Sequence, residues 1–507
     1  MKLLNAFKAQ VEQLGDLKAV WLTSFNFSIE FIETYVLPAV LGLEEPKNRQ
    51  DFEHFQLELT EKNIDFRVFC DKRFMMQDCQ NKRTAIHVHG ITPGRFEKFS
   101  KDSLFHPKVV YLEDVNGKII VGSGSSNLTL GGWARNQEVF TFSEVSSKEQ
   151  YRSVKDFFEN LFNQVGAECH LRARRSFSGS DVSWSFVHSF QENPFLKQLF
   201  EDAQTNHLAV WSPYFAGDLA GYTKRLKKFA GQENLKIAIV PDLVDGKFIR
   251  TQWSENLDAL VANKDITFHT NPTQPDENVE LCHAKVWKIT GKLAIGSWNF
   301  TGPGSNSLPA GNSDQGSANN IEAGIIIRDN HRWEEAVGEP IIFDRGIFAT
   351  PALLDEESLK VPEDLPFDIR VSFNWSRQRY SFTGEWLQGD IDKNYSVKVP
   401  GVAKAINLEW SQTRTLEITS FAIAEQKELL SEHRFDVLYN QNVVNWGLVT
   451  ETDLSFRRAQ AFDSLNDLFD AVYLDSGLGT NDSAPFRIPE NDYHEKSIDE
   501  QMEETLS

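Results

Sequence analysis

The first 350 residues alternate between short apolar runs and longer stretches in which apolar positions recur at helical spacing. Runs rich in β-branched and aromatic residues, such as Ala19–Phe25 and Leu235–Pro241, are typical of buried strands. Helical character follows or separates them over Ser28–Leu41, Ser147–Phe162 and Leu219–Phe229. Because strands alternate with helices, the pattern predicts an α/β fold in which helices cover a mixed sheet.

This series of segments occurs twice in the chain. Four segments match in the same order: Ala19–Phe25 with Ala209–Phe215, Ile64–Cys70 with Leu235–Pro241, Phe105–Thr129 with Cys282–Thr301, and Asn136–Phe142 with Asn320–Ile326. One such match would mean little, but four in sequence indicate an internal duplication. We therefore predict two lobes of the same fold, at residues 1–175 and 176–350.

Each lobe also contains a signal for a tight hairpin. Asn116-Gly117 separates two apolar runs in the first lobe, and Thr290-Gly291 occupies the corresponding place in the second. Asn-Gly between two apolar runs is a strong sign of a two-residue hairpin turn. Each lobe is therefore expected to carry a hairpin at this point.

After about residue 351 the pattern changes to aromatic-rich, strand-like runs separated by polar turns. The runs are residues 367–375, 377–386, 415–423 and 435–446. They predict a separate, mostly β domain at 351–475. Whether this domain gates a cleft or recruits a partner protein stays open. Residues 476–507 are acidic and polar, and we expect a flexible tail there. Residues 461–507 carry a net charge of −10, so the tail is a candidate mimic of nucleic acid.

Composition places the chain among globular proteins of a reducing compartment. With 40% hydrophobic and 25% charged residues, a disordered or fibrous protein is excluded. The apolar runs are far shorter than the roughly 18–20 residues of a membrane span, and the first residues lack the apolar core of a secretory signal. Four cysteines in 507 residues do not make a disulfide framework. We expect a cytoplasmic protein without a membrane anchor.

The net charge of −21 is unevenly distributed. Residues 351–507 hold 14 basic against 29 acidic side chains, and the first 350 hold 38 against 44. Binding of nucleic acid by bulk electrostatics alone is therefore disfavoured. The first 350 residues are close enough to neutral to accommodate a locally basic groove.

Both lobes preserve the same polar residues in the same order: His-x-Lys, then Gly-Ser-x-Asn, then Glu. The set comprises His106, Lys108, Ser125, Asn127 and Glu138 in the first lobe, and His283, Lys285, Ser297, Asn299 and Glu322 in the second. Residues two apart on a strand point to the same face, so each His is expected to share a surface with its Lys. The hairpin would bring the Ser and Asn alongside.

Together these groups suit phosphoryl transfer without a metal. One imidazole can attack phosphorus while a second, protonated imidazole gives a proton to the leaving oxygen. Lys, Ser and Asn are suited to the non-bridging phosphate oxygens, and Glu can fix the tautomer of an imidazole. Two sets that face each other would supply both sides of an in-line displacement. We expect no metal and no cofactor.

At these residues the chain resembles the phospholipase D superfamily, whose members pair two His-x-Lys motifs between two α/β lobes. The resemblance covers about residues 15–330, and it is specific because the motif occurs twice inside a repeat. The sequence departs from the commoner family pattern, which has Asp seven residues after the His. Glu113 and Thr290 stand at those two positions. In having a downstream Asn in place of a strict Asp, the motif resembles that of the tyrosyl-DNA phosphodiesterase and nuclease branches more than that of the lipid-cleaving branch.

The resemblance implies a phosphohistidine intermediate. We expect His106 as the nucleophile and His283 as the general acid, and the reverse order stays open because the two sets are nearly symmetric in the sequence. The resemblance also implies a nuclease that acts on DNA, or alternatively RNA, in repair or in defence against foreign DNA. Two other functions stay open: a phospholipase D-type lipid hydrolase or transferase, and a non-catalytic module that binds phosphate or nucleic acid. Each motif residue also has a non-functional explanation. His and Lys could be solvated strand residues, Ser and Asn could be ordinary turn residues, and Glu could be a surface carboxylate.

Two basic clusters are candidate contacts for a nucleic-acid backbone. The candidates are Arg172, Arg174, Arg175, Lys224 and Lys227. The two lysines fall on a predicted helix, where a solvated face is the commoner explanation of a basic run.

Overall fold

The computed structural model describes residues 2–75, 82–172, 177, 183–203, 205–243, 248–273, 282–308, 318–356, 365–416, 420–422 and 427–457. The chain divides into two compact units. The first comprises Met1–Phe27, Val68–Met75 and His89–Val361, and the second comprises Ser28–Arg67, Met76–Val88 and Pro362–Ser507. The predicted catalytic residues of both lobes all belong to the first unit.

The first lobe is built on a six-stranded sheet with the order β3-β2-β1-β4-β5-β6. Its strands are β1 (Leu17–Ser24), β2 (Asp65–Asp71), β3 (His87–Ile91), β4 (Val109–Asp114), β5 (Ile119–Gly124) and β6 (Phe140–Glu144). The helices in this part of the chain are α1 (Lys2–Leu14), α2 (Ile29–Phe31), α3 (Leu37–Leu41), α4 (Arg49–Glu61) and α5 (Lys148–Val165), with π-helical turns at Ile32–Val36 and Gly131–Arg135.

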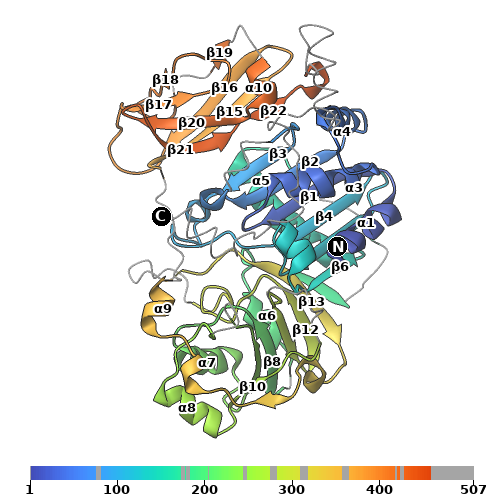
Figure 1. The fold of residues 1–507 in the computed structure, drawn as a ribbon, viewed down its shortest axis with the longest axis vertical. Coiled ribbons are helices and arrows are strands. Elements are labelled where there is room, and N and C mark those ends of the chain that lie inside the picture. The colour runs from blue at the N-terminus through green and yellow to red at the C-terminus, as the bar shows by residue number, and fades with distance from the viewer. Residues whose placement is uncertain are drawn as a thin grey trace, which may run out of the picture. The chain divides into compact units, whose positions relative to one another are not determined.

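The second lobe has an eight-stranded sheet with the order β14-β10-β9-β8-β11-β12-β13-β7 (Figure 1). Its strands are β7 (Trp184–His188), β8 (His207–Ser212), β9 (Lys236–Pro241), β10 (Ile266–His269), β11 (Val286–Ile289), β12 (Gly291–Gly296), β13 (Ala323–Asp329) and β14 (Pro340–Ile341). Strands β8, β9 and β10 pair in parallel and the others antiparallel, so the sheet is mixed. The helices are α6 (Phe195–Phe200), α7 (Leu219–Ala230) and α8 (Glu255–Ala262), followed by α9 (Pro351–Glu356).

The predicted helices and hairpins of the lobes are present. The Ser147 side chain caps α5 by accepting a hydrogen bond from the Gln150 N–H, which satisfies an otherwise unpaired donor. Gly117 turns from β4 to β5 with φ of 86°, and Gly291 turns from β11 to β12 with φ of 80°. These left-handed backbone angles favour glycine, because a Cβ atom would be strained there.

The two lobes share a hydrophobic core. Trp21 and Tyr111 of the first sheet stack at 4.5 Å, and Phe158 of α5 packs against both rings. The same core cluster includes Phe186 of β7 and Ile325 of β13, which belong to the second sheet. Apolar burial thus joins the lobes on one side and fixes the seam at which the polar motifs meet.

One part of the predicted repeat alignment was wrong by two residues. Leu22 of β1 pairs with Val110, and Val210 of β8 pairs with Trp287. Val110 and Trp287 are equivalent, because each lies four residues after a motif histidine. Leu22 therefore corresponds to Val210, whereas the repeat alignment from the sequence pairs Val20 with Val210. A shift of two residues keeps every strand side chain on the same face, so the apolar pattern could not detect it.

The region after residue 365 contains two four-stranded sheets, with the orders β19-β16-β15-β22 and β18-β17-β20-β21. The strands are β15 (Phe367–Asn374), β16 (Arg379–Trp386), β17 (Tyr395–Lys398), β18 (Ile406–Asn407), β19 (Ser420–Ala422), β20 (Arg434–Tyr439), β21 (Asn442–Leu448) and β22 (Thr450–Thr452), and the helix is α10 (Lys427–Ser431). One core cluster takes Phe373 and Tyr380 from the first sheet and Val397 and Val437 from the second, so the sheets form a sandwich. The predicted fold class, two α/β lobes followed by a β-rich region, is confirmed.

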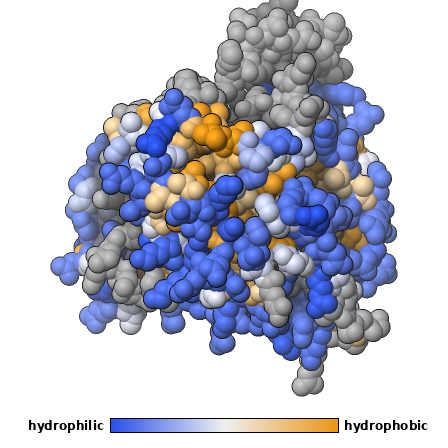
Figure 2. Space-filling view, turned by 90° about the horizontal axis from the view of Figure 1, so that it is seen from below, coloured by the Kyte–Doolittle hydropathy of each residue, from blue (hydrophilic) through white to orange (hydrophobic). Residues whose placement is uncertain are grey.

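The face seen in Figure 2 is mostly hydrophilic, with apolar side chains gathered in one area. Within the described ranges, no helix combines the length and the apolar character that crossing a bilayer requires. The predicted tail at 476–507 lies outside the described residues. The predicted domain limits at 175 and 350 stay predictions.

Candidate active site

The two His-x-Lys segments lie immediately before a strand rather than on one, which corrects the expectation from the sequence. His106 precedes β4 and His283 precedes β11, each with its lysine two residues later. Each segment leaves its own sheet and pairs with the other lobe. The His106 N–H donates to the Ile321 carbonyl at 2.9 Å, and the His283 N–H donates to the Gln137 carbonyl at 3.0 Å.

Two short parallel bridges set the register between the lobes. Phe105 pairs with Ile321, and Gln137 pairs with Cys282. In each bridge, the residue that follows one partner in the sequence is a motif histidine, and the residue that follows the other partner is a motif glutamate. Because the bridges join opposite lobes, each histidine meets the glutamate of the other repeat.

The result is a crossed pair of hydrogen bonds. His106 Nδ1 lies 2.9 Å from the Glu322 carboxylate, and His283 Nδ1 lies 2.9 Å from the Glu138 carboxylate. With Nδ1 engaged by a glutamate, Nε2 is the nitrogen with which each imidazole could act on a substrate, although in His283 it lies 3.0 Å from Lys285 Nζ. The histidine side chains are 10% and 7% exposed, so both lie deep in the seam yet keep an edge accessible.

The motif serines hold the strand segments that carry the glutamates. The Ser125 N–H donates to the Val139 carbonyl at 3.0 Å, and the Val139 N–H donates back to Ser125 Oγ at 3.1 Å. Ser297 makes the same exchange with Ala323 at 3.0 and 3.1 Å. Ser125 Oγ also donates to the Glu138 carboxylate. The serines were predicted to face a phosphate, but their hydroxyl protons are directed at protein acceptors, so their role here is to position Glu.

A glycine precedes each serine because the chain passes very close to the next strand. A Cβ atom on Gly124 would lie 2.2 Å from the Val139 carbonyl oxygen, and one on Gly296 would lie 2.7 Å from that of Ala323. Both approaches are closer than any side chain tolerates. The Gly-Ser step is therefore a packing requirement of the site, beyond ordinary turn chemistry.

The lysines are almost completely buried beside the imidazoles. Lys108 is 1% exposed and its Nζ donates to the His106 carbonyl at 2.8 Å. Lys285 is fully buried, and its Nζ lies 3.1 Å from the His283 carbonyl and 3.0 Å from His283 Nε2. Two buried ammonium groups in one seam favour an anionic ligand, because burial without a partner is costly.

The two motif asparagines have different surroundings. The Asn127 side-chain carbonyl accepts a hydrogen bond from Ser24 Oγ at 3.3 Å, which leaves its amide N–H groups as donors. The buried Asn299 carbonyl oxygen makes no hydrogen bond among the described residues. An unsatisfied buried oxygen is uncommon in a folded protein, so the two asparagines are not equivalent in this structure.

Charges differ between the two His–Glu pairs. Burial lowers the pKa of His106 well below its ordinary value, and the positive charges of Lys108 and Lys285 lower it further. Burial also raises the pKa of its partner Glu322 to about 8. Near neutral pH the pair therefore consists of a neutral His106 imidazole and a protonated Glu322 carboxyl group, so it has little net charge.

The second pair has an ionised carboxylate. Burial raises the pKa of Glu138, but the charge of His283, its hydrogen bond and the charge of Lys285 outweigh burial, so the net shift is downward. Burial lowers the pKa of His283, and the Glu138 charge opposes that shift. The net shift of the His283 pKa is downward, but its imidazolium has the stronger anionic support of the two because Glu138 is ionised.

The lysines also titrate unusually. Burial lowers the pKa of Lys285 to about 8, against the opposing charges of Glu138 and Glu322. Burial likewise lowers the pKa of Lys108 well below its ordinary value, and the charge of Lys285 adds to that effect. The site can hold an anion, deliver or accept a proton on either side of it, and present one imidazole nitrogen as a nucleophile.

The residues seven positions after each histidine contact their own lobe. Glu113 accepts hydrogen bonds from Tyr111 Oη at 2.9 Å and lies 2.6 Å from His170 Nε2 and 3.2 Å from Lys18 Nζ. Burial raises the pKa of Glu113, but the hydrogen bonds from His170 and Tyr111 outweigh it and lower the pKa to about 2. Thr290 Oγ1 lies 3.3 Å from the hydroxyl of another threonine at the foot of β8. The departures from the commoner motif therefore affect lobe packing.

The weaker basic candidates are dispersed. Arg172 is exposed, and its carbonyl accepts a hydrogen bond from Tyr151 Oη at 3.1 Å. Lys224 is exposed on α7, whereas Lys227 pairs with Asp265 at 3.2 Å. Arg174 and Arg175 lie outside the described residues. None of these contacts joins a basic candidate to the histidine seam.

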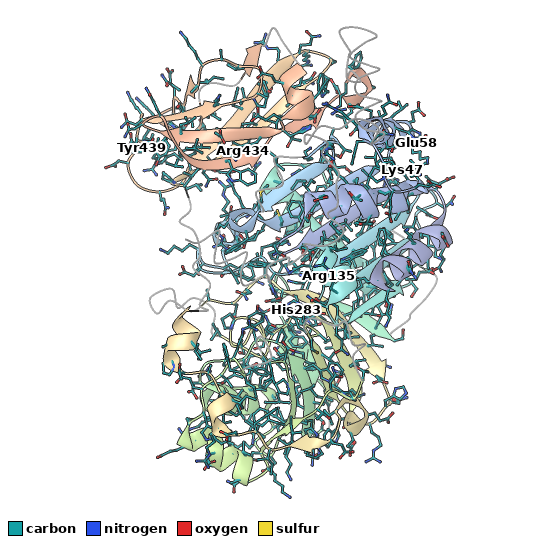
Figure 3. All side chains as sticks on the ribbon, in the orientation of Figure 1. Lys47, Glu58, Arg135, His283, Arg434 and Tyr439 are labelled. Atoms are coloured by element: carbon teal, nitrogen blue, oxygen red, sulfur yellow. The ribbon has the colours of Figure 1, made fainter. Side chains whose placement is uncertain are left out.

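Several side chains at the seam were missed by the sequence comparison. Asn320 donates from Nδ2 to the Glu322 carboxylate at 3.2 Å, and Phe25 lies 5.5 Å from the His106 ring. Tyr214 lies 6.4 Å from the His283 ring. Figure 3 shows His283 at the edge of the second lobe that faces the first, and it labels Arg135 on the first lobe. Asn320 was detectable, because it stands two residues before Glu322 on an extended segment; the aromatic contacts had no signal.

The described residues contain no cluster of three or more His, Cys, Asp or Glu side chains arranged to hold a metal ion. No family model and no curated protein matches the chain. Among solved structures, yeast tyrosyl-DNA phosphodiesterase is similar with 14% identity, covering 63% of this chain and 85% of that chain at a TM-score of 0.40. Phosphatidylserine synthase from Haemophilus influenzae is similar with 12% identity, 64% and 81% coverage and a TM-score of 0.38.

Polyphosphate kinase from Porphyromonas gingivalis is similar with 12% identity, covering 64% of this chain and 43% of that chain at a TM-score of 0.38. These likenesses are distant, and the three names describe different reactions. Function is therefore inferred below from the arrangement of this chain's own side chains.

Proposed function

We propose that the chain is a metal-independent phosphodiesterase of the phospholipase D superfamily, and that it is a nuclease acting on DNA. The observation that carries the proposal is the crossed pairing of His106 with Glu322 and of His283 with Glu138. It gathers two His-x-Lys sets, which are 177 residues apart in the sequence, around one seam. If the motif histidines were solvated strand residues without a shared function, pairing with the glutamate of the other repeat would not be expected.

The proposed reaction has two displacements. His106 Nε2 attacks phosphorus and forms a P–N bond, while the P–O bond to the leaving group breaks and its electron pair goes to the leaving oxygen. His283 gives that oxygen a proton. His283 then takes a proton from a water molecule, which attacks phosphorus and breaks the P–N bond. The products are an alcohol, a phosphate monoester and free His106.

The assignment of His106 as the nucleophile rests on its charge state. A nucleophilic imidazole must be neutral, and the pKa of His106 is the more strongly lowered of the two, chiefly by burial. A general acid must be protonated. Burial lowers the pKa of His283, but less strongly than that of His106, because the ionised Glu138 beside it opposes the shift. A bound phosphate would strengthen this difference, because its negative charge would draw Lys285 away from His283 Nε2 and favour the imidazolium.

The remaining polar groups are assigned to the phosphate. Lys108 and Lys285 supply positive charge, and the Asn127 and Asn299 side chains supply directed hydrogen bonds to the non-bridging oxygens. Nucleic acid is favoured as the substrate because the motif has Asn at these positions, as in the nuclease-like branches that the chain resembles. DNA repair or defence against foreign DNA is the corresponding biological setting.

The test is cleavage in the presence of EDTA. Single-stranded DNA, duplex DNA, RNA and phosphatidylcholine vesicles are incubated with the wild-type protein and with His106→Ala and His283→Ala. His331→Ala is the matched control, because His331 is 75% exposed and pairs only with its neighbour Asp329 among the residues described. We expect DNA cleavage by the wild type and the control, and loss of at least about 10²-fold in each motif variant.

Reactions quenched with detergent at alkaline pH, where a P–N bond is stable, should contain a phosphate adduct on the protein that His106→Ala lacks. Preferred hydrolysis of phosphatidylcholine would replace the nuclease by the lipid-cleaving alternative. Binding of DNA without cleavage of any substrate would favour the non-catalytic alternative. Near-normal DNA cleavage by either histidine variant would refute the paired mechanism.

A further inference from the structure

Each catalytic imidazole has an aromatic neighbour, but the two neighbours are not equivalent. Phe25 is 7% exposed and lies 5.5 Å from the His106 ring, so it acts as a buried wall. Tyr214 is half-buried and meets the His283 ring edge-on at 6.4 Å. By the strand register, Tyr214 corresponds to Asn26 of the first lobe. The duplication therefore does not account for Tyr214, and the second lobe has an aromatic ring that the first lacks at this place.

Tyr214 is held by a buried arginine. The Arg250 guanidinium carbon lies 4.5 Å from the centre of the Tyr214 ring, and Arg250 is 5% exposed. A guanidinium at this distance from an aromatic ring is a favourable cation–π contact, stronger where water is excluded. It fixes the ring and places positive charge on one face of it. A cationic head group such as choline would meet repulsion here.

The direction of the reaction decides which part of a substrate meets this ring. In an in-line displacement the leaving oxygen departs on the side opposite the nucleophile. With His106 as the nucleophile, that side is the one of His283, which donates the proton. The group attached to the leaving oxygen therefore emerges next to Tyr214. An aromatic ring backed by a guanidinium beside a phosphate site is the arrangement on which nucleic-acid bases stack.

We propose that Tyr214, held in place by Arg250, forms a leaving-group subsite that stacks on the base of the departing nucleoside. The subsite selects nucleosides over cationic lipid head groups as leaving groups. This inference rests on the proposed nuclease function and adds the residue that determines specificity on one side of the scissile phosphate.

The test uses octathymidylate in which a single phosphodiester stands among uncleavable methylphosphonate linkages. Two analogues lack the thymine on one or the other side of that phosphodiester. The product released in the pre-steady-state burst identifies the leaving side, because the other fragment stays on the enzyme as the adduct. For the wild type, we expect removal of the leaving-side base to lower kcat/KM by about 5- to 150-fold, the range that base stacking provides.

Tyr214→Leu should lower kcat/KM for the intact substrate by the same factor, and removal of the leaving-side base should then have no further effect. Tyr214→Phe, which keeps the ring, should stay within about threefold of the wild type. An equal loss on the intact and the base-free substrate in Tyr214→Leu would overturn the subsite and leave a structural role. The subsite would also be overturned if removal of the leaving-side base left the kcat/KM of the wild type unchanged. That measurement does not depend on the folding of any variant. Failure of the wild type to cleave any of the three substrates would instead refute the nuclease function.

Discussion

His106 of the first repeat and Glu322 of the second lie 2.9 Å apart, and the reciprocal pair of His283 and Glu138 has the same separation. Each repeat therefore orients the imidazole of the other. Because the two histidines have different roles in the proposed reaction, the two glutamates act on different steps, although they occupy equivalent positions in the sequence. This difference can be measured.

Glu138→Gln is expected to impair proton donation by His283. Cleavage of a DNA phosphodiester should slow by about 10²-fold, because its alkoxide leaving group needs a proton. Cleavage of the p-nitrophenyl ester of thymidine 5′-phosphate should slow much less, because p-nitrophenolate leaves without one. Glu322→Gln acts on the nucleophile, so it should slow both substrates by similar factors. The measurement is the steady-state kcat/KM of each variant for the two substrates. If the ratio of the two kcat/KM values were the same in Glu138→Gln and Glu322→Gln, the assigned roles would be contradicted.

The rate is expected to pass through a narrow optimum near pH 8. Burial raises the pKa of Glu322 to about 8, so the His106–Glu322 pair keeps its extra proton below that pH, and the rate rises as the proton is lost. Burial lowers the pKa of Lys285 to about 8, so its positive charge is lost above that pH, and the rate falls. Lys285→Arg keeps the charge at all accessible pH values.

Profiles of kcat/KM against pH for the wild type and Lys285→Arg check this expectation. The descending limb should move to higher pH in the variant while the ascending limb stays in place. A descending limb that is unchanged in Lys285→Arg would show that another group controls it.

The stability of the fold should depend on pH through Glu322. Its pKa is about 8 in the folded protein, against an ordinary value of 4.5 in an unfolded chain. Between these values the folded protein binds a proton that the unfolded chain has released, so stability falls as pH rises from about 4.5 to about 8. Glu322→Gln removes this dependence. The free energy of unfolding of the variant should gain on that of the wild type by at most about 1.4 kcal/mol per pH unit in this window.

Urea unfolding at pH 5, 6, 7 and 8 measures that difference. Glu334→Gln is the matched control, because Glu334 is exposed and the Arg332 side chain lowers its pKa. Parallel curves for the wild type and Glu322→Gln would mean that the Glu322 carboxylate is already ionised in the folded protein at these pH values.

A buried carboxylate in the second compact unit is expected to be important for stability. Glu451 accepts hydrogen bonds from Trp375 Nε1 at 2.7 Å and Arg457 Nε at 2.9 Å, and lies 3.0 Å from His433 Nδ1. Glu451→Leu would leave the buried Arg457 charge without this partner, at a cost of about 3–5 kcal/mol. Urea unfolding of this variant, compared with the exposed-site control Glu409→Leu, provides the measurement. A loss no larger than that of the control, about 0.5 kcal/mol or less, would contradict the expectation.

Much of the fold could be predicted from the sequence because the two lobes follow local rules. The alternation of apolar runs with helical spacing gave the α/β class, and Gly117 and Gly291 marked the hairpins. The paired His-x-Lys motifs were visible for a different reason. A polar pattern that occurs twice inside a duplication is improbable unless the two copies have the same chemistry.

The assembly of the site was not predictable in the same way. His106 and His283 were expected on strands, but their segments pair with the other lobe, and no local preference encodes a partner more than 140 residues away. The two glutamates were recognised as candidates, yet equivalent residues in a repeat carry no information about which histidine each one meets. Ser125 looked like a phosphate ligand because its hydrogen-bond partner, the backbone at Val139, has no signature in the sequence.

A reciprocal contact, in which one copy reaches the second as the second reaches the first, is what a two-fold symmetric dimer creates at its axis. Joining two such subunits into one polypeptide preserves the axis but removes the obligation to keep both sides identical. Asn127 and Asn299 already differ in their partners, and the counterpart of Tyr214 in the first lobe is Asn26, which has no ring. A single chain can therefore assign attack to one half and departure to the other, as the proposed reaction does with His106 and His283, whereas two identical subunits could not.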